Sequence, residues 1–160
     1  LMVMVPRSQV LAADKEVIVV NTAKAPVPTR DTDNPARQPF QVSVTGSFAA
    51  GEAGGCTAFS VPADKMLVME YVSGFGLLPL GQSMPNFRIS PDIGDGLGPA
   101  HFFPSTSSAT TPTHSFFVVG QATRLYAKGP SSVQVCADRD SHTATAAFTA
   151  SVSGYLVNLP

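Results

Sequence analysis

The fold is decided by Phe40-Gln-Val-Ser-Val-Thr-Gly-Ser-Phe48, in which apolar and polar side chains alternate with a period of two. This period is typical of a β-strand with one face in a core and the other in water. A second run, Met66-Leu-Val-Met-Glu-Tyr-Val-Ser73, is too continuously apolar for a strand with one wet face. We therefore expect residues 66–73 to form a central strand, buried between two sheets.

Other stretches have the same strand character, with β-branched and aromatic residues bounded by turn residues: 16–21, 56–61, 86–90, 100–103, 115–120, 124–127, 132–137 and 145–158. The segments between them are rich in Pro, Gly, Ser and Thr, and we expect loops at 77–85, 90–99 and 104–112. Gly154 is expected to mark a bulge in the last strand. This spacing predicts an all-β, single-domain antiparallel β-sandwich that is jelly-roll-like.

The composition excludes several partners. Charged residues make up only 13% of the chain and hydrophobic residues 44%, with ten basic and eleven acidic side chains giving a net charge of −1. Nucleic-acid binding needs grouped cations, and the basic residues here are scattered singly, so we expect no nucleic-acid partner. No stretch approaches the roughly 20 apolar residues of a membrane-spanning helix, so we expect no transmembrane span.

The first residues carry a signal for export. The apolar run Leu1-Met-Val-Met-Val5 is followed by Val10-Leu11-Ala12, with small residues at the −3 and −1 positions of a signal-peptidase site. We expect residues 1–12 to be a signal-peptide remnant, residues 13–39 a first strand with a proline-rich connector, and residues 40–160 the sandwich body. The protein is then secreted or otherwise extracytoplasmic, in a periplasm or at a cell surface. The alternative is that residues 1–5 belong to the mature chain as a strand or anchor.

The chain has two cysteines, Cys56 and Cys136, and each flanks a strand-like run. In an exported protein an even pair of cysteines favours a disulfide. The alternative is two separate buried thiols that act as small hydrophobic side chains. No C-x-x-C motif or His-Cys spacing indicates a metal or redox centre, and we expect no cofactor.

Four stretches together resemble a group of small secreted bacterial β-sandwich proteins of uncharacterised function. They are Val19-Val-Asn-Thr with Pro26-Val-Pro28, the run Phe59-Ser-Val-Pro-Ala-Asp-Lys-Met-Leu-Val-Met-Glu-Tyr-Val-Ser73, Arg124-Leu-Tyr-Ala127 and Val152-Ser-Gly-Tyr-Leu-Val157. The resemblance covers most of the chain from Glu16 onward. It implies export and a β-sandwich, and it implies no activity.

Two places could carry a site. His101 precedes Phe102 and Phe103, and His114 stands just before two further phenylalanines. If these two strands are neighbours, the imidazoles converge beside four aromatic rings and form a small binding surface. The alternative is that the histidines lie at strand ends and the phenylalanines lie in the core.

Acidic loops are the second place. Asp92 and Asp95 lie in Asp92-Ile-Gly-Asp-Gly-Leu-Gly98 and could begin a calcium site with backbone carbonyls. Ordinary turn chemistry explains the same pattern. The loop Asp138-Arg-Asp-Ser-His142 is a weaker candidate, because Arg139 competes for its carboxylates.

No nucleophile or phosphate-binding motif is complete. Gly81-Gln-Ser-Met-Pro85 ends in proline where a nucleophile elbow needs glycine. We expect a non-catalytic structural or interaction protein that self-associates through its β-sandwich surfaces. The expected partner is another copy of the chain, in a homo-oligomer, or else a surface partner. The low charge supports this expectation, since mixed surface charges are what keep small domains monomeric. Two alternatives are a ligand- or carbohydrate-binding module that uses the 77–108 loops for a glycan, and an enzyme with a dispersed site.

Overall fold

The computed structural model describes residues 38–159. The expected signal remnant at 1–12, the expected strand at 16–21 and nearly all of the proline-rich connector lie outside the described residues. The described strands, in chain order, are β1 (Pro39–Phe48), β2 (Gly54–Val61), β3 (Lys65–Pro79), β4 (Asn86–Ser90), β5 (His101–Phe103), β6 (Thr106–Thr110), β7 (His114–Lys128), β8 (Ser131–Asp138) and β9 (Ala146–Asn158). Within residues 38–159 no helix has the length and apolar character needed to cross a membrane.

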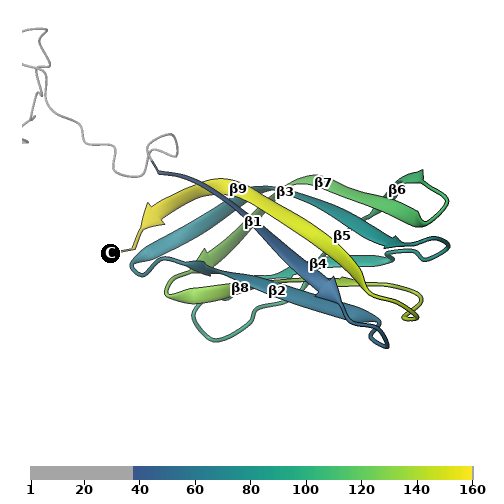
Figure 1. The fold of residues 1–160 in the computed structure, drawn as a ribbon. Helices are drawn as coiled ribbons and strands as arrows, with labels where there is room; N and C mark the ends of the chain where they lie inside the picture. The colour runs from purple at the N-terminus through teal and green to yellow at the C-terminus, as the bar shows by residue number, and fades with distance from the viewer. Residues whose placement is uncertain (1–37, 160) are drawn as a thin grey trace, which may run out of the picture. The chain divides into compact units, whose positions relative to one another are not determined.

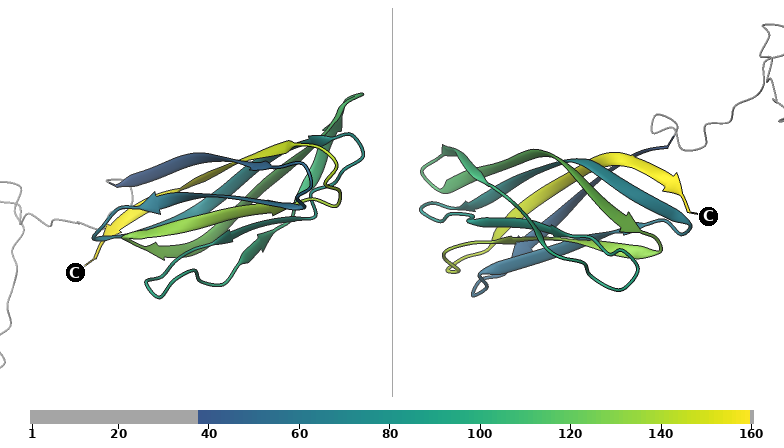
Figure 2. Two further views of the ribbon diagram at one scale, coloured as in Figure 1. Left: turned by 60° about the horizontal axis from the view of Figure 1, so that its bottom comes forward. Right: turned by 180° about the vertical axis from the view of Figure 1, so that it is seen from behind.

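The strands form two antiparallel sheets that pack face to face (Figures 1 and 2). One sheet has the order β1-β9-β3-β7-β6 and the other has the order β2-β8-β4-β5. Apart from the edge strand β6, the first strand pairs with the last, the second with the last but one, and so on inward to β4 with β5. This nested pairing is a jelly roll. The predicted fold class is confirmed.

The core fills the space between the sheets as the alternation in β1 predicts. Phe48 is fully buried, and its ring lies 5.5 Å from that of Phe148 on β9. Phe148 in turn meets the edge of Phe87, from β4 in the opposite sheet, at 6.2 Å between ring centroids. These three rings therefore join the two sheets at the centre of the core.

β3 is the central strand of its sheet, between β9 and β7, as predicted. Its burial is less uniform than expected, because continuous burial ends at Met69 and Glu70 and Tyr71 are exposed. A register irregularity between Met69 and Tyr71 faces Gly154, so the bulge predicted in the last strand lies on its neighbour, with the extra residue, Glu70, on β3. Val68 lies on the solvent side and is buried because Tyr126 and Tyr155 flank it in register.

β3 also continues to Pro79, so the loop predicted from residue 77 begins too early. Two glycines in this part of the strand lie beside large core side chains. A Cβ at Gly74 would lie 3.1 Å from the Phe87 ring, and a Cβ at Gly76 would lie 2.9 Å from the sulfur of Met84. Glycine suits both positions because the side chains of Phe87 and Met84 occupy the space where a Cβ would stand.

Two further predictions are corrected. The expected strands 115–120 and 124–127 are one strand, β7, because the intervening polar residues remain paired with β3. The expected loop at 104–112 contains β6, a fully exposed edge strand that pairs with the first part of β7. Its Ser and Thr residues have no buried face, so the sequence carries no period-two signal there.

The predicted disulfide between Cys56 and Cys136 is present. The two residues lie directly opposite each other on β2 and β8, with their Cα atoms 4.1 Å apart. β2 is an edge strand whose only sheet neighbour is β8. The bond therefore attaches an edge strand covalently to the interior of its sheet.

Arg139 does not compete for the neighbouring carboxylates, contrary to expectation. Asp138 forms an ion pair with Arg88 of β4, and Arg139 is only 3% exposed. Its guanidinium lies 5.3 Å from the centroid of the Phe48 ring. It donates hydrogen bonds to three backbone carbonyls and one side-chain amide, those of Ala49 (2.9 Å), Glu52 (2.9 Å), Ala144 (2.5 Å) and Gln82 (3.3 Å). One buried side chain thus ties together the β1–β2, β3–β4 and β8–β9 connections.

Asp140 strengthens the same end of the sandwich. Its carboxylate accepts hydrogen bonds from the hydroxyl of Ser83 at 2.6 Å and from the backbone N–H of Ser83 at 2.8 Å. These bonds, the hydroxyl bond first, hold the pKa of Asp140 below its ordinary value. The ionised form of Asp140 thus helps to hold the β3–β4 connection against the β8–β9 connection.

Candidate functional site

The histidine cluster considered from the sequence does not form. His101 is on β5 and His114 is on β7, and these strands belong to opposite sheets. His114 hydrogen-bonds Thr113 beside the end of β3, whereas His101 lies near Arg124, ten residues further along β7. Ten residues of strand span roughly 33 Å. Phe102 and Phe103 also separate, since alternate residues of a strand point to opposite faces: Phe102 is 63% exposed and Phe103 lies in the core.

The acidic loop forms a turn. The carboxylate of Asp92 accepts a hydrogen bond from the N–H of Gly94 at 2.7 Å, and Gly94 has a φ of 114°. Asp95 follows on the exposed tip of this turn. Within residues 38–159, no group of three or more His, Cys, Asp or Glu side chains could hold a metal ion. Asp92 therefore has a defined role in the turn, and residues 38–159 place no third His, Cys, Asp or Glu side chain beside Asp92 and Asp95 for a metal ion.

The most distinctive surface is the outer face, by which we mean the solvent-facing side chains of β1, β9, β3 and β7. The register aligns them in five cross-strand rows: Pro39-Tyr155-Val68-Tyr126, Gln41-Ser153-Tyr71-Ala122, Ser43-Ser151-Ser73-Gly120, Thr45-Thr149-Phe75-Val118 and Ser47-Ala147-Leu77-Phe116. None of these side chains is charged. Lys128 and His114 stand beyond the two ends of the rows on β7, while exposed Arg124 on β7 and Glu70 in the bulge of β3 lie between the first two rows. A neutral area of this extent is unusual for a protein surface, where charged side chains are normally interspersed.

Large apolar side chains are exposed on this outer face. Phe75 is 43% exposed and Val118 is 41% exposed, and they are direct neighbours in register. The ring of Phe116 lies 5.7 Å from that of Phe75 and completes the cluster. Contiguous exposed apolar groups of this kind mark interaction sites more often than isolated ones do.

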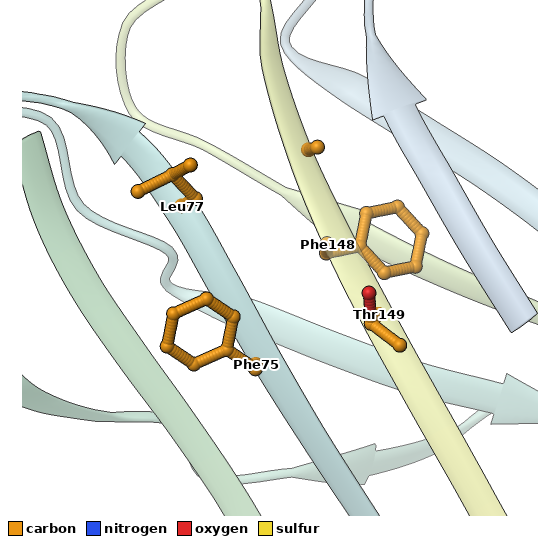
Figure 3. A pocket seen from close by; sticks show the side chains of 5 residues that line it. Phe75, Leu77, Phe148 and Thr149 are labelled. Atoms are coloured by element: carbon orange, nitrogen blue, oxygen red, sulfur yellow. The ribbon is translucent and has the colours of Figure 1, made fainter. Parts of the chain in front are cut away.

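Two shallow hollows lie on either side of the pair formed by Phe75 and Thr149. One has a volume of about 140 Å³ and is lined by Phe75, Leu77, Ala147, Phe148 and Thr149. The other has a volume of about 160 Å³ and is lined by Ser73, Gly74, Phe75, Thr149 and Ser151. Figure 3 shows the first hollow, with Phe75 and Leu77 on β3 and Phe148 and Thr149 on β9. The outer face thus combines a projecting ring with hollows bordered by small side chains.

Polar side chains at the other margin of the face bond to one another. The hydroxyl of Ser151 donates to that of Ser43 at 3.0 Å, and the hydroxyls of Thr45 and Thr149 lie 3.4 Å apart. Hydroxyls that are satisfied within the face are easier to cover than hydroxyls that depend on water. This margin can therefore be desolvated at a modest cost.

This surface was not predicted, because Phe75 falls between the strand expected at 66–73 and the loop expected at 77–85. The signal that could have found it is the order Tyr71, Ser73, Phe75, Leu77, which lies on the opposite phase to the core residues Val72 and Leu78. Large apolar residues on both phases of one strand indicate that both faces are covered or that one binds a partner.

No protein-family model matches the chain, and no curated protein matches it either. The resemblance to small secreted bacterial proteins stays an expectation from the sequence. A jelly roll by itself does not imply a function, because this architecture supports many unrelated ones. The function must therefore be argued from the surfaces of residues 38–159.

Proposed function

We propose that this chain is a non-catalytic interaction protein that works outside the cytoplasm and self-associates through the outer face of its five-stranded sheet. The observation that carries the proposal is a set of five cross-strand rows without a charged side chain, one of which holds the exposed side chains of Phe75 and Val118. The occupant of this face is a second copy of the same chain. The proposed compartment is supported by the disulfide, since such bonds persist in oxidising environments.

The absence of charge favours a second copy over a charged partner. A charged partner surface would lose its hydration against these rows and find no counter-charge within them. A second copy presents the same neutral rows and brings no repulsion. With a net charge of only −1, two whole chains also repel each other weakly.

The shape of the face also suits a two-fold pair. In a two-fold interface residue i of one copy contacts residue j of the other, and j contacts i in return. Phe75 supplies a projecting ring, and the hollow lined by Leu77, Ala147 and Thr149 supplies a place for the ring of the other copy. One surface thus carries both halves of the contact.

The area is sufficient for a specific dimer. Four long strands about 4.8 Å apart make a face roughly 19 Å wide, and a strand of the length of β9 extends roughly 40 Å. The product is close to the about 800 Å² that each partner buries in a standard interface.

Two matched substitutions test the proposal. Phe75→Lys places a charge within the exposed apolar cluster of the proposed interface, and we expect it to weaken self-association at least a hundredfold, because an unpaired charge there must be desolvated. Phe102→Lys introduces the same charge at a more exposed phenylalanine on the opposite sheet, and we expect it to leave the association constant within twofold. Multi-angle light scattering over a range of concentrations measures both. Equal effects of the two substitutions would contradict the assignment of this face.

A further inference from the structure

A groove lies at the edge of β7 that β6 leaves uncovered. β6 pairs with β7 only as far as Val118, and beyond that point the segment 91–100 lies against the remaining edge. The groove has a volume of about 200 Å³ and is lined by Pro91, Ile93, Pro99, His101, Arg124, Leu125 and Tyr126. It is separate from the hollows beside Phe75.

The segment 91–100, which forms one wall of this groove, is held in place by backbone hydrogen bonds. The N–H of Lys128 donates to the carbonyl of Asp92 at 2.8 Å, which attaches the segment to the end of β7. The N–H of Gly98 donates to the carbonyl of Pro91 at 2.7 Å, and Asp92 and Leu97 form an isolated bridge. A wall that is already ordered saves a ligand the entropic cost of ordering it.

The chemistry of the lining is apolar with a cationic end. Pro91, Ile93 and Pro99 supply apolar walls, and Arg124 supplies a guanidinium. Among residues 38–159, Arg124 has no hydrogen bond or ion pair, whereas Arg88 pairs with Asp138 and Arg139 donates hydrogen bonds to several oxygens. A guanidinium presents donors in a planar fork that matches the two oxygens of a carboxylate.

We propose that this groove binds a small organic carboxylate whose apolar body is about the size of one aromatic ring. The carboxylate pairs with Arg124, and the body lies against Pro91, Ile93 and Pro99. The groove volume of about 200 Å³ agrees with a body of this size, since an apolar cavity of about 150 Å³ accommodates benzene. Charge complementarity selects the carboxylate over a neutral sugar, which would leave the guanidinium without a counter-charge.

The test is a titration of the full chain, isotopically labelled, with 3-phenylpropionate, followed by amide and arginine side-chain NMR signals. We expect the signals of Ile93, Arg124 and Tyr126 to shift and saturate at millimolar ligand. The neutral analogue 3-phenylpropionamide should bind about tenfold more weakly, because it lacks the charge that Arg124 recognises.

Matched variants distinguish binding in the groove from non-specific attraction of the carboxylate to a positive charge. Arg124→Gln should weaken 3-phenylpropionate binding about tenfold and leave binding of the amide unchanged. Lys128→Gln removes the same charge from a neighbouring exposed position outside the groove, and its effect should be below twofold. The proposal is overturned if the groove signals do not move, if the amide binds equally well, if the two variants behave alike, or if glucose shifts these signals and the carboxylate does not.

Discussion

Replacing Cys56 and Cys136 together by alanine is expected to lower the free energy of unfolding by about 4 kcal/mol. The bond closes a loop with a sequence separation of 80 residues, and removing it returns that entropy to the unfolded chain. The folded state also suffers, because β2 is an edge strand that pairs in its sheet with β8 alone. Urea denaturation of the variant against the parent protein measures the difference.

The control for this experiment is a second cross-strand pair on the same two strands. Ser60 and Ser132 are register partners on β2 and β8, and both are exposed. Replacing them together by alanine should change the free energy of unfolding by less than about 0.5 kcal/mol. A cysteine variant that loses less than about 1 kcal/mol would show that the disulfide contributes little to the stability of this sandwich.

Arg139→Ala is expected to cost about 3–5 kcal/mol of stability. The substitution removes every hydrogen bond from the guanidinium to Ala49, Glu52, Ala144 and Gln82 and leaves their oxygens inside the protein. Each unsatisfied buried acceptor costs about 1–3 kcal/mol, reduced where water can enter. It also removes the cation from the ring of Phe48.

Two further variants serve as comparisons for Arg139→Ala. Arg139→Lys keeps the charge but cannot reach three connections at once, so an intermediate loss is expected. Arg124→Ala, at an exposed arginine without a partner among the described residues, should stay within about 0.5 kcal/mol of the parent protein. Thermal unfolding by circular dichroism gives all three values. If Arg139→Ala and Arg124→Ala are equally stable, Arg139 does not organise this end of the sandwich.

The fold was predictable from the sequence where a local pattern of apolar and polar residues corresponds to a single structure. Alternation in residues 40–48 predicted β1, and the apolar run 66–73 predicted a central strand. The errors arose where tertiary contacts override local preference. β3 extends past the expected start of the loop at residue 77, and in this stretch Gly74 and Gly76 leave room for the ring of Phe87 and the sulfur of Met84.

The surfaces were less predictable than the fold for a related reason. A site is made by residues from several strands, and their order in the sheet cannot be read from one strand at a time. His101 and His114 are near in sequence but belong to opposite sheets, whereas Phe75 and Thr149 are far apart in sequence and direct neighbours in register. Arg139 was misjudged because its hydrogen-bond partners, three backbone carbonyls and the side chain of Gln82, come from three separate connections.

The most direct test of the proposed self-association is an isotope-filtered NOE measurement on a mixture of labelled and unlabelled chains. It detects only protons that are close across two copies. We expect contacts between the ring protons of Phe75 in one copy and the methyl groups of Ala147 and Thr149 in the other. An absence of contacts between copies at high micromolar concentration, or contacts from Phe102 on the opposite sheet instead, would contradict the proposal.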